Sequence, residues 1–187
     1  MRVISGKLKN KKLYFEKNSK TRPLKDSVRE NIFNILKHSK KTNISLRNSN
    51  VMDLYAGTGS FGIECLSRDA SYVLFVEQDK NALINLKKNI DSTYMKNKTS
   101  ISSLDVLKIF KVENYERKFD LVFLDPPYLN NTYVDIINIL KEKKILKKIH
   151  LIIIHRDKNS NDKLRNYVNI IEKRVYGRSE IFFVTLL

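Results

Sequence analysis

Short apolar runs alternate with amphipathic segments along most of this chain, and this alternation is the feature that most constrains its fold. The runs predict strands at 51–55, 72–76, 119–124 and 151–154, with a weaker strand near 99–102. A helix is predicted to begin near Gly59, and the spacing of Leu83, Leu86 and Ile90 predicts the apolar side of another. Nearly continuous apolar strands are typical of parallel strands that are buried on both faces. We therefore predict an α/β fold, a three-layer sandwich around a doubly wound, mostly parallel sheet.

The two ends of the chain depart from this alternation. Strands are predicted at 168–174 and 181–187, and the short turn around Gly177 makes them an antiparallel hairpin at one edge of the sheet. At the other end, a Lys- and Asn-rich turn between apolar groups at 3–4 and 13–15 predicts a β-hairpin.

A helix is predicted after Pro23, because apolar residues recur there at helical spacing. These residues are Val28, Ile32, Ile35 and Leu36. A polar stretch separates this helix from the first strand of the main body. We therefore predict an N-terminal basic hairpin and helix at residues 1–38 and a main domain at residues 50–187.

The composition fits a folded domain and argues against several other classes of protein. The chain has 187 residues, of which 42% are hydrophobic, too many for a disordered tail. No apolar run approaches the ~20 residues of a membrane-spanning helix, and the amino terminus has no apolar signal-peptide stretch. One cysteine and three scattered histidines give neither a disulfide framework nor a metal site. We expect a cytoplasmic monomer with no membrane contact and no metal.

The chain is strongly basic, with a formal net charge of +16. Residues 1–25 contain nine basic side chains and one acidic side chain, so this segment carries +8, half of the total. Such a cluster favours a nucleic-acid partner, because phosphate contacts release counterions. The alternative is a biased genome composition that enriches lysine with no ligand involved. The predicted substrate-binding side chains are Lys7, Lys9, Lys11, Lys12, Arg22 and Arg29.

A glycine-rich turn, Ala56-Gly57-Thr58-Gly59-Ser60-Phe61-Gly62, follows the first strand of the main domain. Its glycines allow a tight turn and the close approach of a ligand to a helix amino terminus. Glu77, at the end of the next strand, can accept hydrogen bonds from both hydroxyls of a ribose. This pattern alone fits a nicotinamide dinucleotide or S-adenosylmethionine. Asp53 favours the second, because a carboxylate beside the turn would repel a pyrophosphate and attract a cationic amino-acid group.

The segment Asp125-Pro126-Pro127-Tyr128 directly follows the strand at 119–124. Its prolines remove two backbone donors and hold the chain extended, so nearby carbonyl oxygens are free to accept hydrogen bonds. The Asp125 carboxylate is also an acceptor, and together these groups can hold an amino group with its lone pair directed outward. Tyr128 offers a flat face for a splayed-out base, a contact worth about 1–3 kcal/mol. The alternative is a Pro-Pro turn that Asp125 merely caps.

Both segments together resemble the amino-group methyltransferases that use S-adenosylmethionine. Residues 21–36, TRPLKDSVRENIFNIL, are similar to the Arg-Pro, Val-Arg-Glu and Phe-Asn-Ile-Leu signature of one family. This family is the bacterial small-subunit (16S) ribosomal RNA guanine-N2 methyltransferases of the RsmD type. The agreement extends through residues 1–7, 62–68, 75–77 and 176–177, so the resemblance covers nearly the whole chain.

The resemblance implies a Rossmann-like, class I methyltransferase core that carries an N-terminal β-hairpin and helix, with S-adenosylmethionine as cofactor. It implies that Asp53, Gly57 and Gly59 hold the methionine part of the cofactor, that Glu77 holds the ribose, and that Asp105 with Val106 meets the adenine. Ala56 and Gln78 are also expected to be cofactor-binding residues. For Asp105 a second role stays open, as the N-cap of a short helix at 106–110.

The chain departs from the pattern of this family in three places. Leu24 and Lys25 stand where small hydroxylated residues are usual, and Asn10 replaces a common glycine. His155 and Arg156 follow an apolar strand, where the family tends to have Glu. We give neither residue a catalytic role and expect His155 at the surface, at the end of its strand.

The resulting prediction is an enzyme that transfers a methyl group from S-adenosylmethionine to the exocyclic N2 of one guanine in 16S ribosomal RNA, either free or in an assembling subunit. The predicted catalytic residues are Asp125, Pro126, Pro127 and Tyr128. Because a sulfonium is a good leaving group, the protein mainly positions two reactants for direct displacement. Three alternatives stay open: methylation of adenine or cytosine in DNA, methylation of a protein glutamine, and RNA binding without catalysis.

Overall fold

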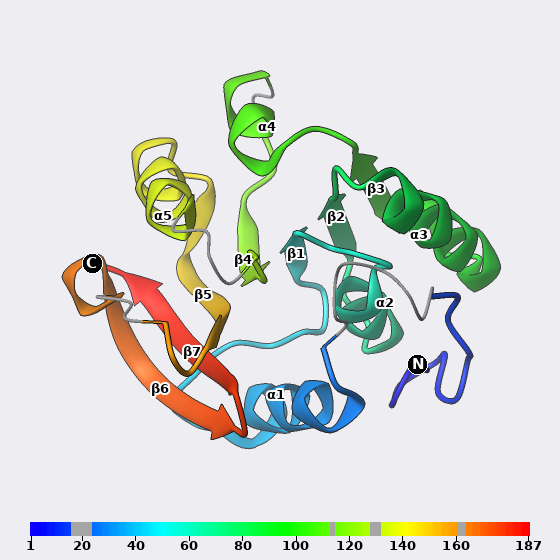
Figure 1. Cartoon of the computed structure of the whole chain (residues 1–187), viewed down its shortest axis with the longest axis horizontal. Coiled ribbons are helices and arrows are strands. Elements are labelled where there is room, and N and C mark those ends of the chain that lie inside the picture. The colour runs from blue at the N-terminus through cyan, green and yellow to red at the C-terminus, as the bar shows by residue number, and fades with distance from the viewer. Residues whose placement is uncertain (16–23, 113–114, 128–131, 161–163) are drawn as a thin grey trace.

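The computed structural model describes residues 1–15, 24–112, 115–127, 132–160 and 164–187. In this part of the chain, seven strands form one sheet in the order β3-β2-β1-β4-β5-β7-β6 (Figure 1). The strands are β1 (Asn50–Leu54), β2 (Tyr72–Val76), β3 (Thr99–Ser102), β4 (Phe119–Leu124), β5 (Leu146–Asp157), β6 (Val168–Tyr176) and β7 (Ser179–Leu186). Strands β1 to β5 are parallel, whereas β7 is antiparallel to β5 and β6. The predicted doubly wound sheet and its C-terminal antiparallel hairpin are confirmed.

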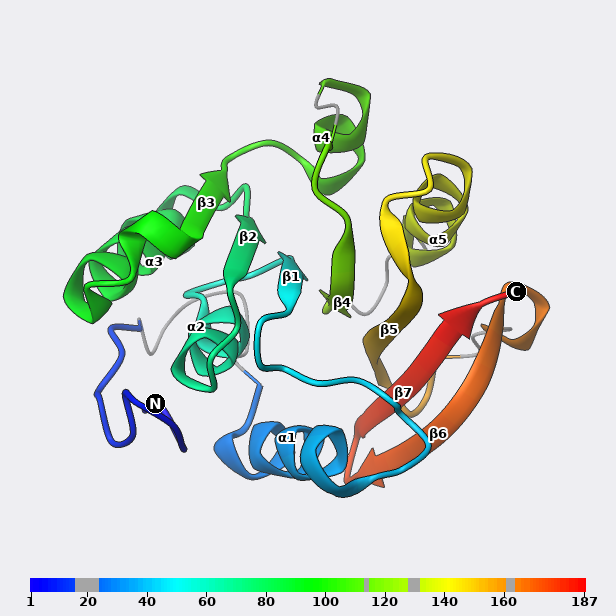
Figure 2. The same cartoon turned by 180° about the vertical axis from the view of Figure 1, so that it is seen from behind.

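Helices cover both faces of the sheet. They are α1 (Asp26–His38), α2 (Ser60–Ser67), α3 (Lys80–Thr93), α4 (Val106–Val112) and α5 (Thr132–Glu142), with short 3-10 helices η1 (Lys96–Lys98) and η2 (Leu164–Asn166). Figures 1 and 2 show α1, α2 and α3 on one face and α4 and α5 on the other. The three-layer arrangement is therefore confirmed.

Alternate side chains of the central strands fill two apolar clusters. Val51, Leu121 and Ile153 pack on the side of α1, α2 and α3, and they belong to one cluster of buried residues. Met52 and Val122, their neighbours along the chain, belong to the second cluster on the side of α4 and α5. Because side chains of a strand alternate between faces, both faces of β1 and β4 must be apolar to be buried in this way.

The strand order reverses between β1 and β4. The chain runs from β1 through β2 to β3 on one side and then returns to β4 on the other side of β1. Open α/β sheets bind ligands at such a switch point, beyond the carboxyl ends of the strands. The register aligns Leu54 with Leu124, so the segments that leave β1 and β4 begin side by side. These segments are the glycine turn and the one that begins with Asp125.

The N-terminal hairpin is present but has little strand character. One antiparallel bridge joins Arg2 to Lys12, and it is flanked by hydrogen bonds between the backbones of Val3, Asn10 and Lys11. The structure assigns no longer strand to this segment. Apolar residues at positions 3–4 and 13–15 predicted two strands, but Val3 and Leu13 are buried against the protein core. The hairpin is thus held by packing against the protein core more than by its own strand pairing.

Two elements differ from the sequence prediction. Strand β5 reaches Asp157, because the residues after Ile154 continue to pair with β7. Helix α5 was not predicted, although Tyr133, Ile136 and Leu140 lie at helical spacing and are buried. Within the described ranges, no helix is long and apolar enough to cross a membrane. The same ranges contain no group of three or more His, Cys, Asp or Glu side chains that could hold a metal ion.

Candidate active site

The glycine turn joins β1 to α2 in a conformation that depends on glycine. Gly57 and Gly59 have φ angles of 56° and 83°, in the left-handed region. At Gly59 space is also limiting, because a Cβ would lie 2.4 Å from Cδ1 of Leu86. At Gly57, in contrast, a Cβ would meet no described atom within 4 Å. Open space therefore adjoins the turn at Gly57.

Asp53 is buried in β1, on the side of the sheet that α2 covers. Its Oδ2 accepts a hydrogen bond of 2.9 Å from the backbone N–H of Gly62, in the first turn of that helix. Burial raises the pKa of Asp53 well above its ordinary value, and the nearby charges of Asp125 and Glu77 raise it further. A carboxyl of this kind ionises more readily when a positive charge lies beside it. The contact of Asp53 with a cationic ligand group stays a prediction.

Glu77 connects the glycine turn to the end of β2. Glu77 is 8% exposed, and its Oε2 accepts a hydrogen bond of 2.7 Å from the N–H of Gly57. Its Oε1 accepts a second hydrogen bond, of 2.8 Å, from the N–H of Asp79. The carboxylate is therefore fixed at the turn, while Gln78 beside it is exposed.

Asp105 caps α4 in this structure. Its Oδ1 accepts hydrogen bonds from the backbone N–H groups of Leu107, at 2.9 Å, and Lys108, at 3.3 Å. This geometry matches the N-cap role that the sequence left open. Val106 is buried in the apolar cluster under α4 and α5, and Ala56 donates its N–H to the carbonyl of Val76. The adenine contact of Asp105 and Val106 stays a prediction.

Asp125 directly follows β4 and lies beside β1. Its N–H donates to the carbonyl oxygen of Leu54, at 3.4 Å, and its side chain is 23% exposed. Pro126 is buried and Pro127 is exposed. Tyr128, the predicted base-stacking residue, lies outside the described residues. The structure thus brings Asp125 to the same sheet edge as the glycine turn.

The expectation that His155 lies at the surface is wrong. His155 is 3% exposed, and its Nδ1 lies 2.8 Å from Oδ1 of Asp125. The cause is the length of β5: His155 still pairs with Ile181 of β7, so it lies within the sheet and not in a loop at its surface. Arg156, on the opposite face, is also buried and lies over the ring of Tyr133, 4.8 Å from its centroid.

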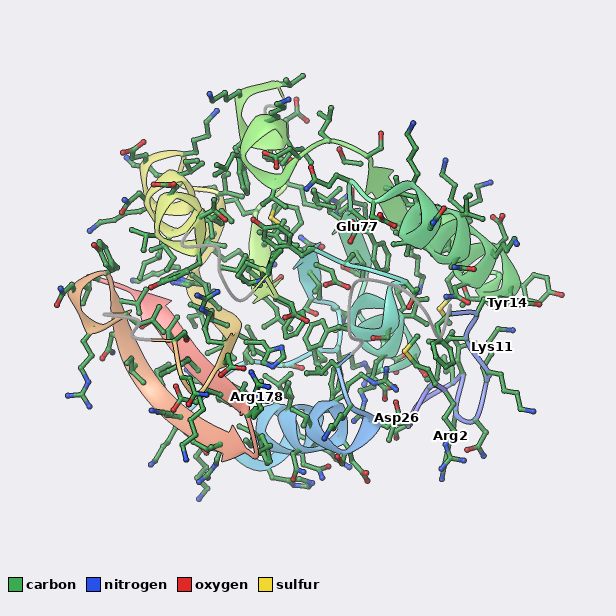
Figure 3. The ribbon with its side chains drawn as sticks, in the orientation of Figure 1. Arg2, Lys11, Tyr14, Asp26, Glu77 and Arg178 are labelled. Carbon is green, nitrogen blue, oxygen red and sulfur yellow. The ribbon has the colours of Figure 1, made fainter. Side chains whose placement is uncertain are left out.

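The predicted phosphate-binding lysines lie on the N-terminal hairpin, at the margin of the molecule. Figure 3 shows Lys11 there, whereas Glu77 lies nearer the middle. Lys9 and Lys12 are exposed and Lys11 is half-buried. Lys7 already forms an ion pair of 2.5 Å with Asp69, and this contact lowers the pKa of the Asp69 carboxyl. Lys9, Lys11 and Lys12 form no ion pair with any described acidic residue.

Arg29 does not fit the predicted role of a phosphate contact, and Arg22 lies outside the described residues. The Arg29 side chain is fully buried, and its Nη2 donates to the carbonyl oxygen of Arg2 and, at 2.9 Å, to Oδ1 of Asp26. Burial lowers the pKa of this guanidinium. Arg29 is buried together with the apolar side chains of α1, and its hydrogen bond to the carbonyl of Arg2 links that helix to the N-terminal hairpin.

Sequence analysis missed two buried residues that join the hairpin to the glycine-turn region. Glu64 of α2 accepts hydrogen bonds from the N–H groups of Ile4, at 2.7 Å, and Ser5, at 3.0 Å. Asn89 of α3 accepts from the N–H of Tyr14, at 2.7 Å, and its amide donates to the carbonyls of Tyr14 and Thr58, at 3.0 and 2.9 Å. For Asn89 there was a local signal of burial, since it stands beside Ile90 on the apolar side of its helix, but this signal did not indicate which groups its amide contacts.

Curated relatives match nearly the whole chain. The family model described as Conserved hypothetical protein 95 matches residues 1–185. Ribosomal RNA small subunit methyltransferase D of Haemophilus influenzae is 36% identical over 163 residues, which cover 85% of this chain and 80% of that protein. The protein of the same name from Buchnera aphidicola subsp. Acyrthosiphon pisum is 29% identical over 180 residues, 96% of this chain and 90% of that protein.

Solved structures share the fold. The yhhF protein of Escherichia coli, provisionally described as a methyltransferase, has a TM-score of 0.82 at 24% identity and covers 100% of this chain and 97% of that chain. SMU.776, also provisionally described as a methyltransferase and complexed with SAH, has a TM-score of 0.63 at 16% identity, with 78% of this chain and 47% of that chain covered. The chain therefore has a Rossmann-like, class I methyltransferase fold and belongs to the Conserved hypothetical protein 95 family, that of the RsmD-type methyltransferases.

Proposed function

We propose that this protein uses S-adenosylmethionine to methylate the exocyclic N2 amine of one guanine in small-subunit (16S) ribosomal RNA. Its family and its relatives, which are named ribosomal RNA small subunit methyltransferase D, support the substrate class. One observation in this chain carries the chemistry. The partly exposed carboxylate of Asp125 stands next to the glycine turn, where an amine that it holds would lie beside a bound cofactor.

The residues around the glycine turn fit S-adenosylmethionine. Glu77 would bind the ribose hydroxyls, since its carboxylate accepts hydrogen bonds and is held at the turn by two backbone amides. Asp53 would face the cationic amino group, which would offset the cost of ionising a buried carboxyl. The open space at Gly57 leaves room for a ligand. When bound, the cofactor supplies an electrophilic methyl group on a sulfonium.

The segment that begins with Asp125 would position the substrate amine. Asp125 would accept a hydrogen bond from one N–H of the guanine N2 group. Proline has no backbone N–H, so neither Pro126 nor Pro127 can donate to a nearby carbonyl oxygen, which can then also accept from the amine. Tyr128 would stack on the base. These contacts would hold the N2 amine in one orientation beside the cofactor site, and catalysis would come mainly from this alignment.

The N-terminal extension, residues 1–38, would bind the RNA backbone, and residues 50–187 would form the catalytic domain. Glu64 and Asn89 fix the hairpin to α2 and α3, the two helices that follow β1 and β2. The exposed lysines of the hairpin are thus held in a fixed position relative to the turn. Phosphate contacts of this kind orient a substrate without reading its sequence.

The proposed function is tested by incubating the purified protein and labelled S-adenosylmethionine with 16S ribosomal RNA, both free and in small subunits. Nucleoside mass spectrometry of the digested RNA should show N2-methylguanosine. The Glu77→Ala variant, which lacks the ribose acceptor, should bind the cofactor more weakly and yield less product. Methylation of adenine or cytosine in DNA, of a protein glutamine, or of nothing at all would each contradict the proposal.

Removing the charges of Lys9, Lys11 and Lys12 with glutamine is expected to weaken RNA binding. It should also flatten the dependence of log Kd on log salt by about two units, since each lost phosphate contact removes somewhat less than one unit. Binding assays over a range of salt concentrations measure both effects. Cofactor affinity should not change.

A second triple variant controls for net charge. Lys141, Lys143 and Lys148 carry the same total charge as the three hairpin lysines, and all three are exposed. Lys141 is in α5, Lys143 directly follows that helix and Lys148 is near the start of β5. Figures 1 and 2 show α5 far from the N-terminal hairpin. Glutamine at these positions should leave the salt slope nearly unchanged. Equal flattening in both triple variants would mean that the overall charge, rather than the hairpin, attracts RNA.

A further inference from the structure

We infer that His155 is a positioning residue for methyl transfer: it holds one oxygen of Asp125 and so leaves the other to receive the substrate amine. The inference rests on the proposed function, because it assumes that Asp125 binds an amine. It also assigns a task to a buried histidine that the sequence placed at the surface.

The contact follows from the register of the sheet. β4 and β5 are parallel neighbours, and Leu124 is aligned with Ile154. The next residues, Asp125 and His155, therefore lie side by side, with 2.8 Å between Oδ1 and Nδ1. His155 is enclosed, at 3% exposure, whereas the Asp125 side chain is 23% exposed. One partner is thus fixed in the sheet and the other reaches the site.

The chemistry of the pair sets the direction of the hydrogen bond. An ionised carboxylate only accepts, so Nδ1 of His155 carries the hydrogen and donates it to Oδ1. Oδ2 has no hydrogen-bond partner among the described residues. Rotation of the carboxylate would exchange the two oxygens, and the hydrogen bond to His155 opposes that rotation. An amine donating to Oδ2 would then meet an acceptor in one orientation.

The hydrogen bond from His155 to Asp125 also matters because a second carboxyl, that of Asp53, lies nearby. This carboxyl is buried on the same face of the sheet, and the charge of Asp125 raises the pKa of Asp53. The two carboxylates therefore repel each other, and a hydrogen-bond donor on the other side of Asp125 offsets this repulsion. His155 in β5 is on that far side, because β4 lies between β1 and β5.

Two substitutions separate a positioning role from a merely structural one. In His155→Asn the side-chain amide can donate from nearly the place of Nδ1, whereas His155→Leu has similar bulk and no donor. We expect His155→Leu to lower kcat for RNA methylation about 10- to 100-fold, as for a misplaced reactant. The kcat of His155→Asn should stay within a few-fold of the wild-type kcat. The Kd for S-adenosylmethionine should be unchanged in both variants.

The double variant Asp125→Ala/His155→Leu completes the test. If His155 acts through Asp125, the kcat of the double variant should be no lower than the kcat of Asp125→Ala alone. Further slowing in the double variant, full activity of His155→Leu, or equal losses in His155→Leu and His155→Asn would overturn the inference.

A spectroscopic readout keeps the inference testable if the proposed function fails. In protein labelled with ¹⁵N-histidine, His155 should show a protonated Nδ1 whose hydrogen exchanges slowly. That signal should be lost in Asp125→Ala. Absence of N2-methylguanosine with the signal present would refute the proposed substrate and retain the pairing. Absence of the signal in the wild-type protein would refute the pairing whatever the substrate.

Discussion

Replacing Asp125 by alanine is expected to slow methyl transfer to RNA by a factor of ~10² or more, because the amine loses the acceptor that aligns it. Cofactor affinity should barely change. Glu77 keeps its two backbone partners, and loss of the Asp125 charge makes Asp53 easier to ionise, which does not disfavour a cationic ligand. Single-turnover rates and calorimetric titration with S-adenosylmethionine measure the two quantities separately.

Asp120 offers a matched control on the same strand. Its side chain is 19% exposed, and its Oδ2 accepts hydrogen bonds from the N–H of Asn50, at 2.8 Å, and from Nζ of Lys147, at 2.9 Å. It lies at the opposite end of β4 from Asp125. Asp120→Ala should lower the free energy of unfolding by about 1–3 kcal/mol and leave the rate per folded molecule intact. A wild-type rate for Asp125→Ala, or equal slowing in both variants, would remove Asp125 from the proposed mechanism.

The parallel part of the sheet could be predicted because its strands carry their signal locally. Val51 and Met52 face opposite sides of the sheet and are both buried, so the run of apolar residues is itself the mark of a central strand. The end of β5 could not be predicted in this way. His155 is polar, and its burial depends on pairing with Ile181, which is remote in sequence.

The same physical reason explains what was wrong about Arg29. An arginine on a helix is usually solvated, and no local pattern indicates that the carbonyl of Arg2 will accept its hydrogen bond. The positions of the glycine turn and of Asp125 could be predicted, because their motifs directly follow β1 and β4, whose carboxyl ends lie side by side. Their partners, such as Asn89, depend on tertiary contacts that a motif does not contain.

Replacing Gly6 by alanine is expected to detach the N-terminal hairpin from α2 and to abolish most RNA methylation. Gly6 has a φ angle of 82°, and a Cβ there would lie 1.9 Å from the backbone oxygen of Ser67. That oxygen accepts the N–H of Lys7, at 2.8 Å, and the Ser67 hydroxyl donates to the carbonyl of Ser5, at 2.5 Å. Because the clash is with backbone, the hairpin must move and lose these bonds. RNA affinity should fall at least as far as in the lysine triple variant.

Gly177→Ala separates this loss of docking from the strain of a left-handed residue. Gly177 also has a positive φ, 62°, but a Cβ there would meet no described atom within 4 Å. Both variants pay about 1–2 kcal/mol for the left-handed backbone, and only Gly6→Ala displaces the hairpin. Limited proteolysis should therefore cut within residues 1–15 in Gly6→Ala alone, while cofactor titration stays near wild type in both. If Gly6→Ala bound and methylated RNA as well as Gly177→Ala, a docked hairpin would not be needed to hold the substrate.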